Sequence, residues 1–234
     1  MAGMRDLRQD LSGLWRAASH VAPAQGALVV MFIAAHKGEG TSSVAASFAL
    51  MAASRAVRTA WLVDLDIRRN YQYTSFAQGI LKDVGRPGHA LDASLGTEQI
   101  YTVAGHETDL SYGKLLNAHQ IDGLRLLVTR FRSDRLAAGQ RVRLRPGPAW
   151  WSALRAAADW AVIDAPALER TRAGLSFVSQ ADAVVLVVKA DETSASDVSA
   201  LRQDVEAQGG TVIGVVMNRI REDALLAGRF QTFN

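Results

Sequence analysis

The sequence predicts an α/β fold in which helices cover both faces of a doubly wound, mainly parallel sheet. Two observations support this prediction: short apolar runs of strand length recur along the chain, and segments of helical periodicity separate several of them. The apolar runs lie at residues 27–34, 59–63, 124–128, 160–163, 183–189 and 212–217, and the helical patterns at 42–55, 148–158 and 194–208.

Length and composition set the class of protein. The chain has 234 residues, of which 49% are hydrophobic and 21% charged, so it suits one domain with a sizeable core and is neither disordered nor fibrous. It has no cysteine, which excludes disulfide frameworks, cysteine zinc sites and thiol nucleophiles. The longest strongly apolar run, at 27–35, is too short to span a bilayer, and the N-terminus has no secretory h-region. We therefore expect a cytoplasmic protein.

The N-terminal segment is predicted to be helical. We expect residues 1–25 to form a helical extension and residues 26–234 to form the α/β domain. Within 4–18 one helical stripe is apolar and most other positions are charged or polar. The stripe consists of Leu7, Leu11, Leu14, Trp15 and Ala18. It fits a helix docked on its own domain and a helix that mediates assembly with a second subunit or a membrane partner equally well.

Two later segments are harder to interpret. Residues 71–122 contain six glycines and few periodic apolar positions, so we expect loops and short helices there. Of the 26 basic residues, 22 are arginines, and seven of these lie between Arg125 and Arg145 with a single acid, Asp134. Such a stretch suits an anionic partner such as phosphate, nucleic acid or acidic lipid, but only Phe131 supplies an aromatic ring, so it is a weak nucleic-acid signal.

The strongest local motif is AHKGEGTSS at 35–43, which follows an apolar strand and precedes a helix. Glycines there let backbone N–H groups point at an anion, the helix N-terminus adds a positive field, and a hydroxyl can bind Mg²⁺ on the phosphates. The predicted cofactor-binding residues are Gly38, Glu39, Gly40, Thr41, Ser42 and Ser43. Taken alone, the segment also fits a plain glycine turn.

The motif departs from the full P-loop pattern, G-x-x-x-x-G-K-[ST]. Ala35 stands at the first glycine, and Thr41 stands where a lysine would reach the β- and γ-phosphates. Thr41 offers a hydroxyl without a charge. We expect Lys37 to replace the missing charge in part, either in its own site or across a dimer.

Carboxylates end two of the predicted strands. In AWLVDLDIRR, Asp64 and Asp66 alternate with Leu65 and point to the same side at the strand's carboxyl end, where open α/β sheets bind ligands. They can hold Mg²⁺ or act as a general base, although a solvated strand end paired with Arg68 and Arg69 fits as well. In WAVIDAP, Asp164 ends another apolar strand in the Walker B manner and is the third predicted metal-associated acid.

The ordered set of motifs resembles the bacterial tyrosine-kinase (BY-kinase) family of capsule and exopolysaccharide biosynthesis proteins, within the MinD/ParA group of P-loop ATPases. The set is GEGTSS, LVDLDIRR, WAVIDAP, ADAVVLVVKADETS and GGTVIGVVMNR, and it spans about residues 26–220. The resemblance implies a sheet of P-loop NTPase, MinD/ParA-like type. It also implies ATP or ADP with Mg²⁺ as cofactors.

The resemblance implies roles for individual residues. LVDLDIRR corresponds to the family's Walker A′ motif, D-x-D-x-R, so Asp64 would be the base and a metal-associated acid, together with Ser42, Asp66 and Asp164. Asn218 lies where relatives contact the adenine, and Arg219 follows it in the same MNR element. Arg5 and Arg8 resemble half of the family's E-x-x-R-x-x-R assembly motif.

Three departures from the family pattern bear on function. The P-loop lysine is replaced by Thr41, the glutamate of the assembly motif by Ala2, and the tail GRFQTFN has no tyrosine cluster to phosphorylate. The four tyrosines are Tyr71, Tyr73, Tyr101 and Tyr112. We therefore expect a weak or inactive kinase-like protein.

The leading hypothesis is a degenerate BY-kinase-like regulator or scaffold in exopolysaccharide or capsule biosynthesis or export. It would form homo-oligomers and bind a membrane copolymerase or chain-length protein at the inner face of the plasma membrane, with no nucleic-acid partner. The alternative is an active MinD/ParA-type ATPase in which Lys37 supplies the charge and which acts as a dimerisation switch at a membrane or on DNA. A third hypothesis is a protein that acts only by interacting with other proteins, with Thr41 and Glu39 filling its phosphate site.

Overall fold

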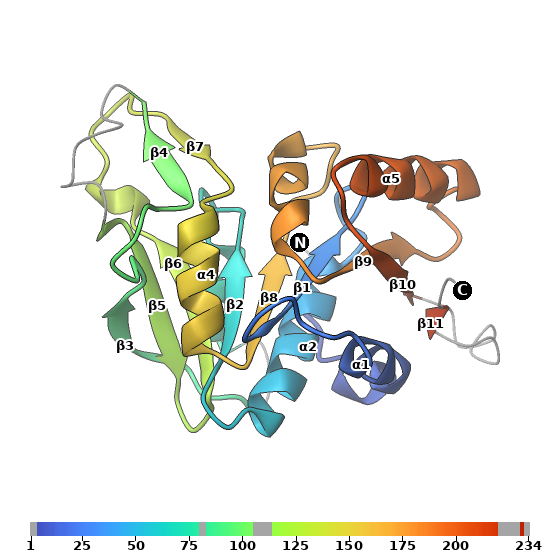
Figure 1. Cartoon of the computed structure of the whole chain (residues 1–234), viewed down its shortest axis with the longest axis horizontal. Helices are drawn as coiled ribbons and strands as arrows, with labels where there is room; N and C mark the ends of the chain where they lie inside the picture. Colours follow the sequence, from blue (N-terminus) through green and yellow to red (C-terminus); the bar gives the residue numbers. More distant parts are fainter. Residues whose placement is uncertain (1–3, 80–82, 105–113, 220–229, 232–234) are drawn as a thin grey trace.

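The computed structural model describes residues 4–79, 83–104, 114–219 and 230–231. Its main feature is a nine-stranded sheet with strand order β11-β10-β9-β1-β8-β2-β6-β5-β3, beside a small two-stranded sheet of β4 and β7 (Figure 1). The strands are β1 Leu28–Ile33, β2 Ala60–Asp64, β3 Pro87–Asp92, β4 Tyr101–Val103, β5 Leu116–Ile121, β6 Leu126–Phe131, β7 Val142–Leu144, β8 Trp160–Asp164, β9 Ala183–Lys189, β10 Val212–Asn218 and β11 Phe230–Gln231.

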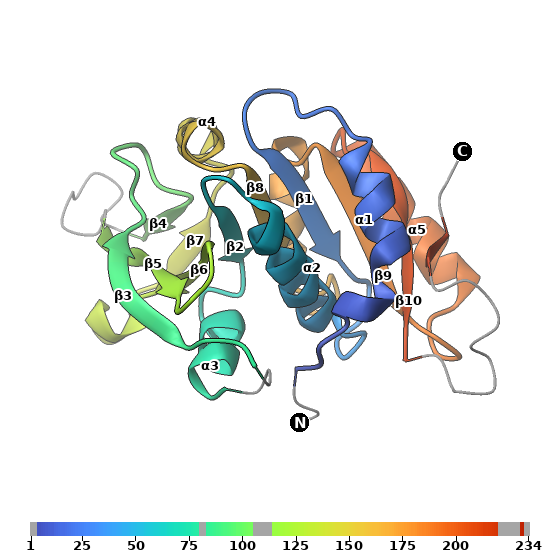
Figure 2. The same ribbon diagram turned by 90° about the horizontal axis from the view of Figure 1, so that it is seen from below.

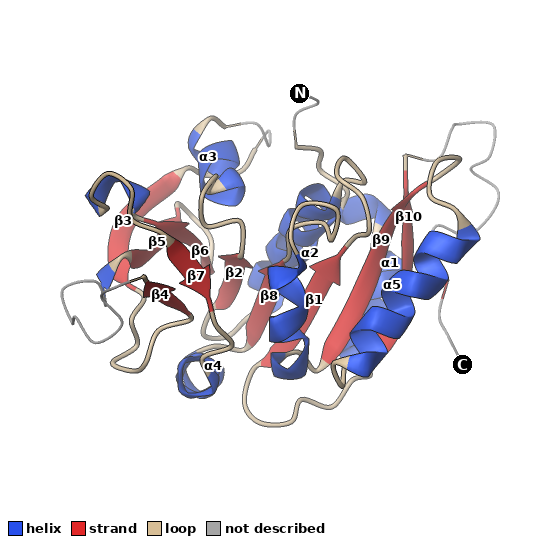
Figure 3. Cartoon of the chain, turned by 90° about the horizontal axis from the view of Figure 1, so that it is seen from above, coloured by secondary structure: helices blue, strands red, loops and turns tan. Residues whose placement is uncertain are grey.

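Helices lie on both faces of the sheet, so the predicted doubly wound, mainly parallel α/β fold is confirmed. Helices α1 and α2 cover one face, while α4, the 3₁₀ segment η4 and α5 cover the other (Figures 2 and 3). The helical segments are η1 Arg8–Asp10, α1 Ser12–Ser19, α2 Thr41–Arg55, α3 Tyr71–Ala77, η3 Ser133–Arg135, α4 Pro148–Ala157, η4 Arg172–Gln180 and α5 Ala195–Ala207.

The central strands are buried on both faces, which explains their uninterrupted apolar runs. Side chains of a strand alternate between faces, and β1 divides accordingly between two cores. Val29, Met31 and Ile33 pack with α4 and α5 residues, whereas Val30 and Phe32 pack with residues of α1 and α2. Burial on both faces therefore fixes β1, β8 and β2 side by side, with their carboxyl ends at one edge.

The prediction for residues 71–122 is wrong. Besides the short helix α3, the segment contains β3, β4 and β5, and the sheet continues past β6 through the antiparallel pairs β6–β5 and β5–β3. In β5 the buried residues Leu116 and Ala118 alternate with the less buried Asn117, and β3 is almost wholly exposed. An antiparallel strand with one solvated side carries polar residues, so it shows no continuous apolar run.

The strand expected at 124–128 is shifted. It begins at Leu126 and continues to Phe131, so it includes the polar residues Thr129 and Arg130. A turn at Asp122 and Gly123, where Gly123 adopts a φ of 75°, separates it from β5 and delays its start.

The N-terminal segment docks on its own domain. Met4, Leu7, Leu11, Leu14 and Ala18 are buried in the core that α2 forms with the sheet. The Trp15 ring lies 4.7 Å from that of Trp160 and 5.5 Å from that of Phe48, centroid to centroid. The apolar stripe therefore has an intramolecular partner, while a role of this segment in assembly stays a prediction. Among the described residues, no helix has the length and apolar character needed to cross a membrane.

Candidate functional site

A cavity of about 590 Å³ lies at the carboxyl ends of β1, β2 and β8. The loop after β1, the start of α2, the end of β2 and the loop after β8 form its walls. The residues that line it are His36, Lys37, Gly38, Gly40, Thr41, Ser42, Ser43, Asp64, Asp66, Arg69, Tyr71, Asp164, Ala165, Pro166, Ala167, Arg170 and Arg219. Most of the predicted site residues therefore meet in one place.

The loop before α2 has the geometry of an anion cradle. Gly38 and Gly40 both line the cavity and adopt φ values of 86° and 91°, a backbone conformation that favours glycine. Gly40 is the N-cap of α2, no side chain caps this helix, and its first turn carries no acid. The positive end of this 15-residue helix is thus available to an anion, although the Ser43 N–H already donates to the Gly40 carbonyl at 3.0 Å.

Glu39 and Asn218 support this loop from behind and do not line the cavity. The buried Glu39 carboxylate accepts hydrogen bonds from the His36 N–H, at 2.8 Å, and from the Thr193 hydroxyl. The Asn218 side-chain amide donates to the Glu39 carbonyl at 2.8 Å and lies so close to Gly40 that a Cβ there would be 1.9 Å from Asn218 Nδ2. Glu39 therefore does not fill the phosphate site, and Arg219 rather than Asn218 faces the cavity.

The three hydroxyls at the start of α2 have different surroundings. Thr41 is buried against the cavity at the position of the absent lysine. Ser42 is hydrogen-bonded to Asp164. The Ser43 hydroxyl accepts a hydrogen bond from the Arg5 N–H at 3.2 Å, so it ties the N-terminal segment to α2. Among the three, Ser42 is the one placed beside a carboxylate, which suits a role in binding Mg²⁺.

Asp64 and Asp164 are neighbours on adjacent strands, since they are register partners in the parallel pair β2–β8. Backbone N–H groups of Asp66 and Gln72 donate to Asp64 at 2.8 and 3.0 Å. The Gln72 side-chain amide donates to Asp164 at 2.7 Å and to the Ser42 carbonyl at 3.0 Å. Gln72 thereby holds both acids and the start of α2 in one arrangement.

Burial raises the pKa of both carboxyl groups. For Asp164 the loss of surrounding water is the largest cause, and the nearby charge of Asp64 adds to it. For Asp64, burial raises the pKa while the hydrogen bonds from Gln72 and Asp66 oppose the shift. The pair therefore binds a proton more readily than exposed carboxyls do, and a cation between the two groups would favour their ionised form.

Two ion pairs occupy the rim of the cavity. Arg170 contacts Asp66 at 2.7 Å, and Lys37 contacts Glu169 at 3.2 Å. The alternative in which Asp64 and Asp66 pair with Arg68 and Arg69 is therefore wrong, because Arg170, from the loop after β8, takes that place. Lys37 is 73% exposed and neutralised by Glu169, so in this chain it stands at the rim rather than in the place of the P-loop lysine.

The donor set fits Mg²⁺ only together with a phosphate. Within the described residues, no group of three or more His, Asp or Glu side chains could hold a metal by itself. Asp66 is engaged by Arg170, which leaves Ser42, Asp64 and Asp164 as the oxygen donors. Mg²⁺ commonly takes one or two carboxylates and completes its shell with water and substrate phosphates, so this set is adequate.

The sequence interpretation missed several residues that shape the site. Gln72 and Thr129 position the acids, the latter by accepting the Asp64 N–H at 2.9 Å, and Arg170, Glu169 and Thr193 hold the rim and the loop. The position of Arg170 and Glu169 shortly after WAVIDAP could have flagged them as loop residues next to the site. Nothing in the local pattern marks Gln72 or Thr129.

No protein-family model matches the sequence, and no curated protein matches it either. Solved structures do match. The VpsO kinase domain has a TM-score of 0.60 at 19% identity and covers 92% of this chain and 95% of its own. The kinase domain of the Escherichia coli tyrosine kinase ETK has a TM-score of 0.55 at 17% identity, with 88% and 72% covered.

A further match is the septum site-determining protein MinD from Pyrococcus horikoshii, solved in complex with Mg-ADP. It has a TM-score of 0.50 at 16% identity, with 82% of this chain and 70% of that chain covered. These likenesses confirm the expected fold, that of BY-kinase domains and MinD/ParA-type P-loop ATPases.

Proposed function

We propose that this protein is a degenerate BY-kinase-like P-loop protein that binds ATP or ADP with Mg²⁺. It would act as a cytoplasmic regulator or scaffold in bacterial exopolysaccharide or capsule biosynthesis or export. The observation that supports nucleotide binding best is the meeting of two features in one cavity. The uncapped start of α2 is open to an anion, and Ser42, Asp64 and Asp164 offer oxygen atoms to a cation beside it.

In this proposal the backbone binds the phosphates, whereas side chains bind Mg²⁺. The backbone from Gly38 to Ser43 would bind the phosphates, and Arg219 would lie beside the nucleotide. Ser42 and the two buried acids would hold Mg²⁺, which supplies charge neutralisation on the phosphates when bound. The volume of about 590 Å³ lies within the usual range for small-molecule sites.

The same geometry supports binding better than phosphoryl transfer. Without a lysine at position 41, the site lacks a charge-assisted hydrogen bond that contributes about 1.5–3 kcal/mol to binding, and more in the transition state. Lys37 does not compensate within this chain, since Glu169 already neutralises it. Backbone N–H groups and carboxylates remain, so we expect binding with weak or absent turnover.

One observation favours the alternative, an active MinD/ParA-type ATPase. Lys37 lines the cavity and is largely exposed, so an incoming second copy could draw it away from Glu169 toward a nucleotide. The ATPase hypothesis requires that the protein dimerises when it binds ATP and that its turnover depends on protein concentration. A Lys37→Gln variant would then lose turnover, whereas the leading proposal expects little change in binding.

The partner and location of the protein follow from the sequence resemblance. We propose that it forms homo-oligomers and associates with the inner face of the plasma membrane through a polysaccharide copolymerase or chain-length protein. Light scattering of the purified protein tests the first statement. Recovery in the membrane fraction only when such a partner is co-expressed tests the second.

Calorimetric titration of Mg-ATP and Mg-ADP into the native protein tests the central proposal. We expect a Kd of the order of 1–100 μM, tightened about tenfold or more by Thr41→Lys because the variant restores the charge-assisted contact. Asp164→Asn should abolish the dependence on Mg²⁺. Asp204→Asn, which makes the same carboxyl-to-amide change on α5, is the matched control and should bind like the native protein.

The titration distinguishes a nucleotide-binding protein from one that acts through its surfaces alone. Binding to native protein and to Thr41→Lys supports the proposal. Binding only to Thr41→Lys would mean that the native cavity keeps its shape but does not bind nucleotide without the lysine. The protein would then act through its surfaces alone. If neither protein gives a binding signal in the titration, the proposal of nucleotide binding is contradicted.

A further inference from the structure

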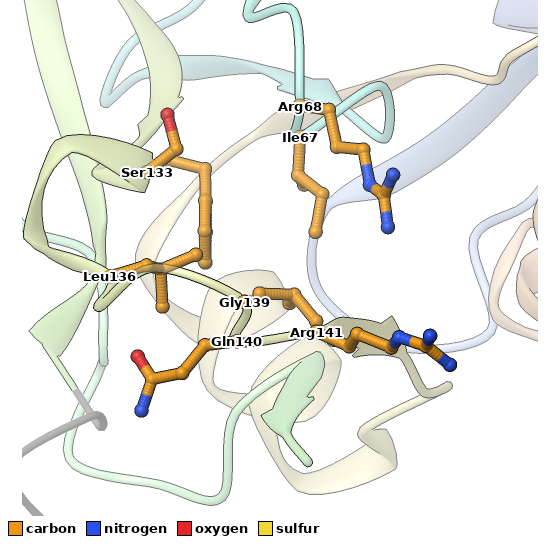
Figure 4. A pocket seen from close by; sticks show the side chains of 9 residues that line it. Ile67, Arg68, Ser133, Leu136, Gly139, Gln140 and Arg141 are labelled. Carbon is orange, nitrogen blue, oxygen red and sulfur yellow. The ribbon is translucent and has the colours of Figure 1, made fainter.

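A second cavity, of about 270 Å³, lies on the other side of the Walker A′ loop from the nucleotide cavity. Its walls are Ile67 and Arg68 from that loop, Phe131 at the end of β6, and the segment 133–142, which belongs to the arginine-rich stretch (Figure 4). Neither Arg68 nor this stretch contributes to the nucleotide cavity. Two sequence features without a role in the first site therefore meet in a second one.

The floor of this cavity is apolar. Ile67 and Phe131 are 6% and 2% exposed, and Leu136 and Val142 are half-buried beside them. In Figure 4 the Ile67 side chain points toward the segment that carries Gly139 and Arg141. At about 270 Å³ the space is smaller than most small-molecule sites and has room for one apolar side chain.

The rim is positively charged and incompletely neutralised. Arg132 pairs with Asp134, Arg145 pairs with Glu98, and Arg130 lies 4.6 Å from the Tyr73 ring centroid. Four further arginines are exposed and have no ion-pair partner within the described residues. They are Arg68, Arg135, Arg141 and Arg143.

We propose that this surface binds an acidic polypeptide segment that inserts one apolar side chain into the cavity. The charges extend beyond the cavity, so the ligand must carry several negative charges around its apolar group. The observation that carries the proposal is the apolar floor of Ile67, Phe131, Leu136 and Val142 beneath Arg68 and Arg141, which have no ion-pair partner in the described part of the chain.

The chemistry favours a polypeptide over nucleic acid or lipid. Phe131, the aromatic residue of the cavity, is buried in the floor and offers no face on which a base could stack. A membrane would require apolar side chains that protrude, yet the exposed large hydrophobic residues in the described chain are Val57, Leu91 and Met217, none of which lines this cavity. A concave apolar floor instead accepts a side chain from a partner.

Fluorescence anisotropy with a labelled heptapeptide of six glutamates around one central leucine tests the proposal. We expect the native protein, without nucleotide, to bind this peptide about tenfold more tightly than the same peptide with serine in place of leucine. Arg141→Glu should weaken binding about tenfold or more, because it reverses a rim charge. Arg16→Glu, the same change at an exposed residue of α1, is the matched control and should leave binding within about twofold.

Three results would overturn the proposal. Equal affinity for the leucine and serine peptides would mean that only surface charge acts. Equal effects of Arg141→Glu and Arg16→Glu would place the binding elsewhere, and tighter binding of a single-stranded oligonucleotide than of the peptide would identify a nucleic-acid surface. If Arg141→Glu melts below the native protein, Arg68→Gln replaces it with the same expected loss. Because no nucleotide is present, failure here and failure of nucleotide binding are distinguishable.

Discussion

The two ends of the large sheet are built on different principles. From β10 to β2 the strands are parallel and covered by helices on both faces, so their residues are almost all buried. From β6 to β3 they are antiparallel, and β3 exposes most of its side chains. In the parallel part each strand must be apolar throughout, whereas the antiparallel part tolerates polar residues. That difference explains why the sequence signal is strong in one part and faint in the other.

The two parts also differ in charge. At the carboxyl edge of the parallel part, acids are buried or paired: Gln72 contacts Asp64 and Asp164, and Arg170 contacts Asp66. Beside the antiparallel part, Arg68 and Arg141 have no acidic partner among the described residues. The proposed nucleotide site and the proposed acidic-peptide surface therefore lie on opposite sides of one loop.

The largest expected contrast comes from one substitution made in each part. Leu62 is fully buried at the centre of β2, so Leu62→Ala removes core contacts and should lower the free energy of unfolding by about 3 kcal/mol. Leu91→Ala on β3, where the leucine is 45% exposed, should lower it by less than about 0.5 kcal/mol. Urea unfolding of both variants measures the difference. Similar losses would show that β3 is covered in solution by a partner or second copy.

A smaller contrast separates two glycines with positive φ. Gly40→Ala at the start of α2 meets both an unfavourable φ of 91° and the Asn218 amide, and should cost about 2–3 kcal/mol of stability. Gly139→Ala in the arginine-rich segment has a φ of 82° but no atom within 4 Å of the new Cβ, and should cost about 1 kcal/mol. Equal thermal shifts in the two variants would mean that Asn218 moves aside freely and does not fix the loop.

The buried acids predict a pH-dependent stability. The folded-state pKa of Asp164 is raised above its ordinary value of 3.8, so the folded chain binds more protons than the unfolded chain between the two pKa values. The free energy of unfolding therefore falls as the pH rises from the ordinary pKa to the raised one. Asp164→Asn removes the cost and should be more stable than the native protein by about 1–2 kcal/mol in alkaline buffer, with little difference near pH 4.

Urea unfolding from pH 4 to 9 in the absence of Mg²⁺ measures this difference. Asp204→Asn serves again as the control, since Asp204 lies on α5 and pairs with Arg172 at the surface. A stability gain of Asp164→Asn that does not grow with pH would contradict a raised pKa for this carboxyl group.

The smallest expected effect concerns two exposed arginines of the arginine-rich stretch. Replacing Arg135 and Arg143 with glutamine together should leave the free energy of unfolding within about 0.5 kcal/mol of the native value, because both are exposed and neither gives up an ion pair seen among the described residues. The same variant should bind the acidic leucine peptide more weakly. A marked loss of stability would show instead that these charges hold the fold.

The residues that sequence reasoning placed correctly share a local cause. Gly38 and Gly40 lie in the loop because only a strand, a glycine turn and a helix fit that segment, and Asp64 and Asp164 lie at strand ends because their strands are apolar up to them. Arg68 shows the limit of this reasoning. Its neighbour Arg69 lines the larger cavity at the carboxyl ends of β1, β2 and β8, whereas Arg68 lines the smaller second cavity. Two adjacent residues of one motif therefore belong to different cavities, and the local sequence does not distinguish them.

The sequence by itself determined the parallel sheet, the glycine loop before α2 and the edge at which three acids gather, because burial on two faces imposes apolar runs that can be recognised locally. Only the tertiary structure decided that Arg170 pairs with Asp66, that Gln72 bridges the two buried acids, and that Glu39 turns away from the cavity. These contacts join residues up to 154 positions apart in the chain. Sequence periodicity cannot predict these contacts, because each depends on which loops the packed sheet brings to the same edge.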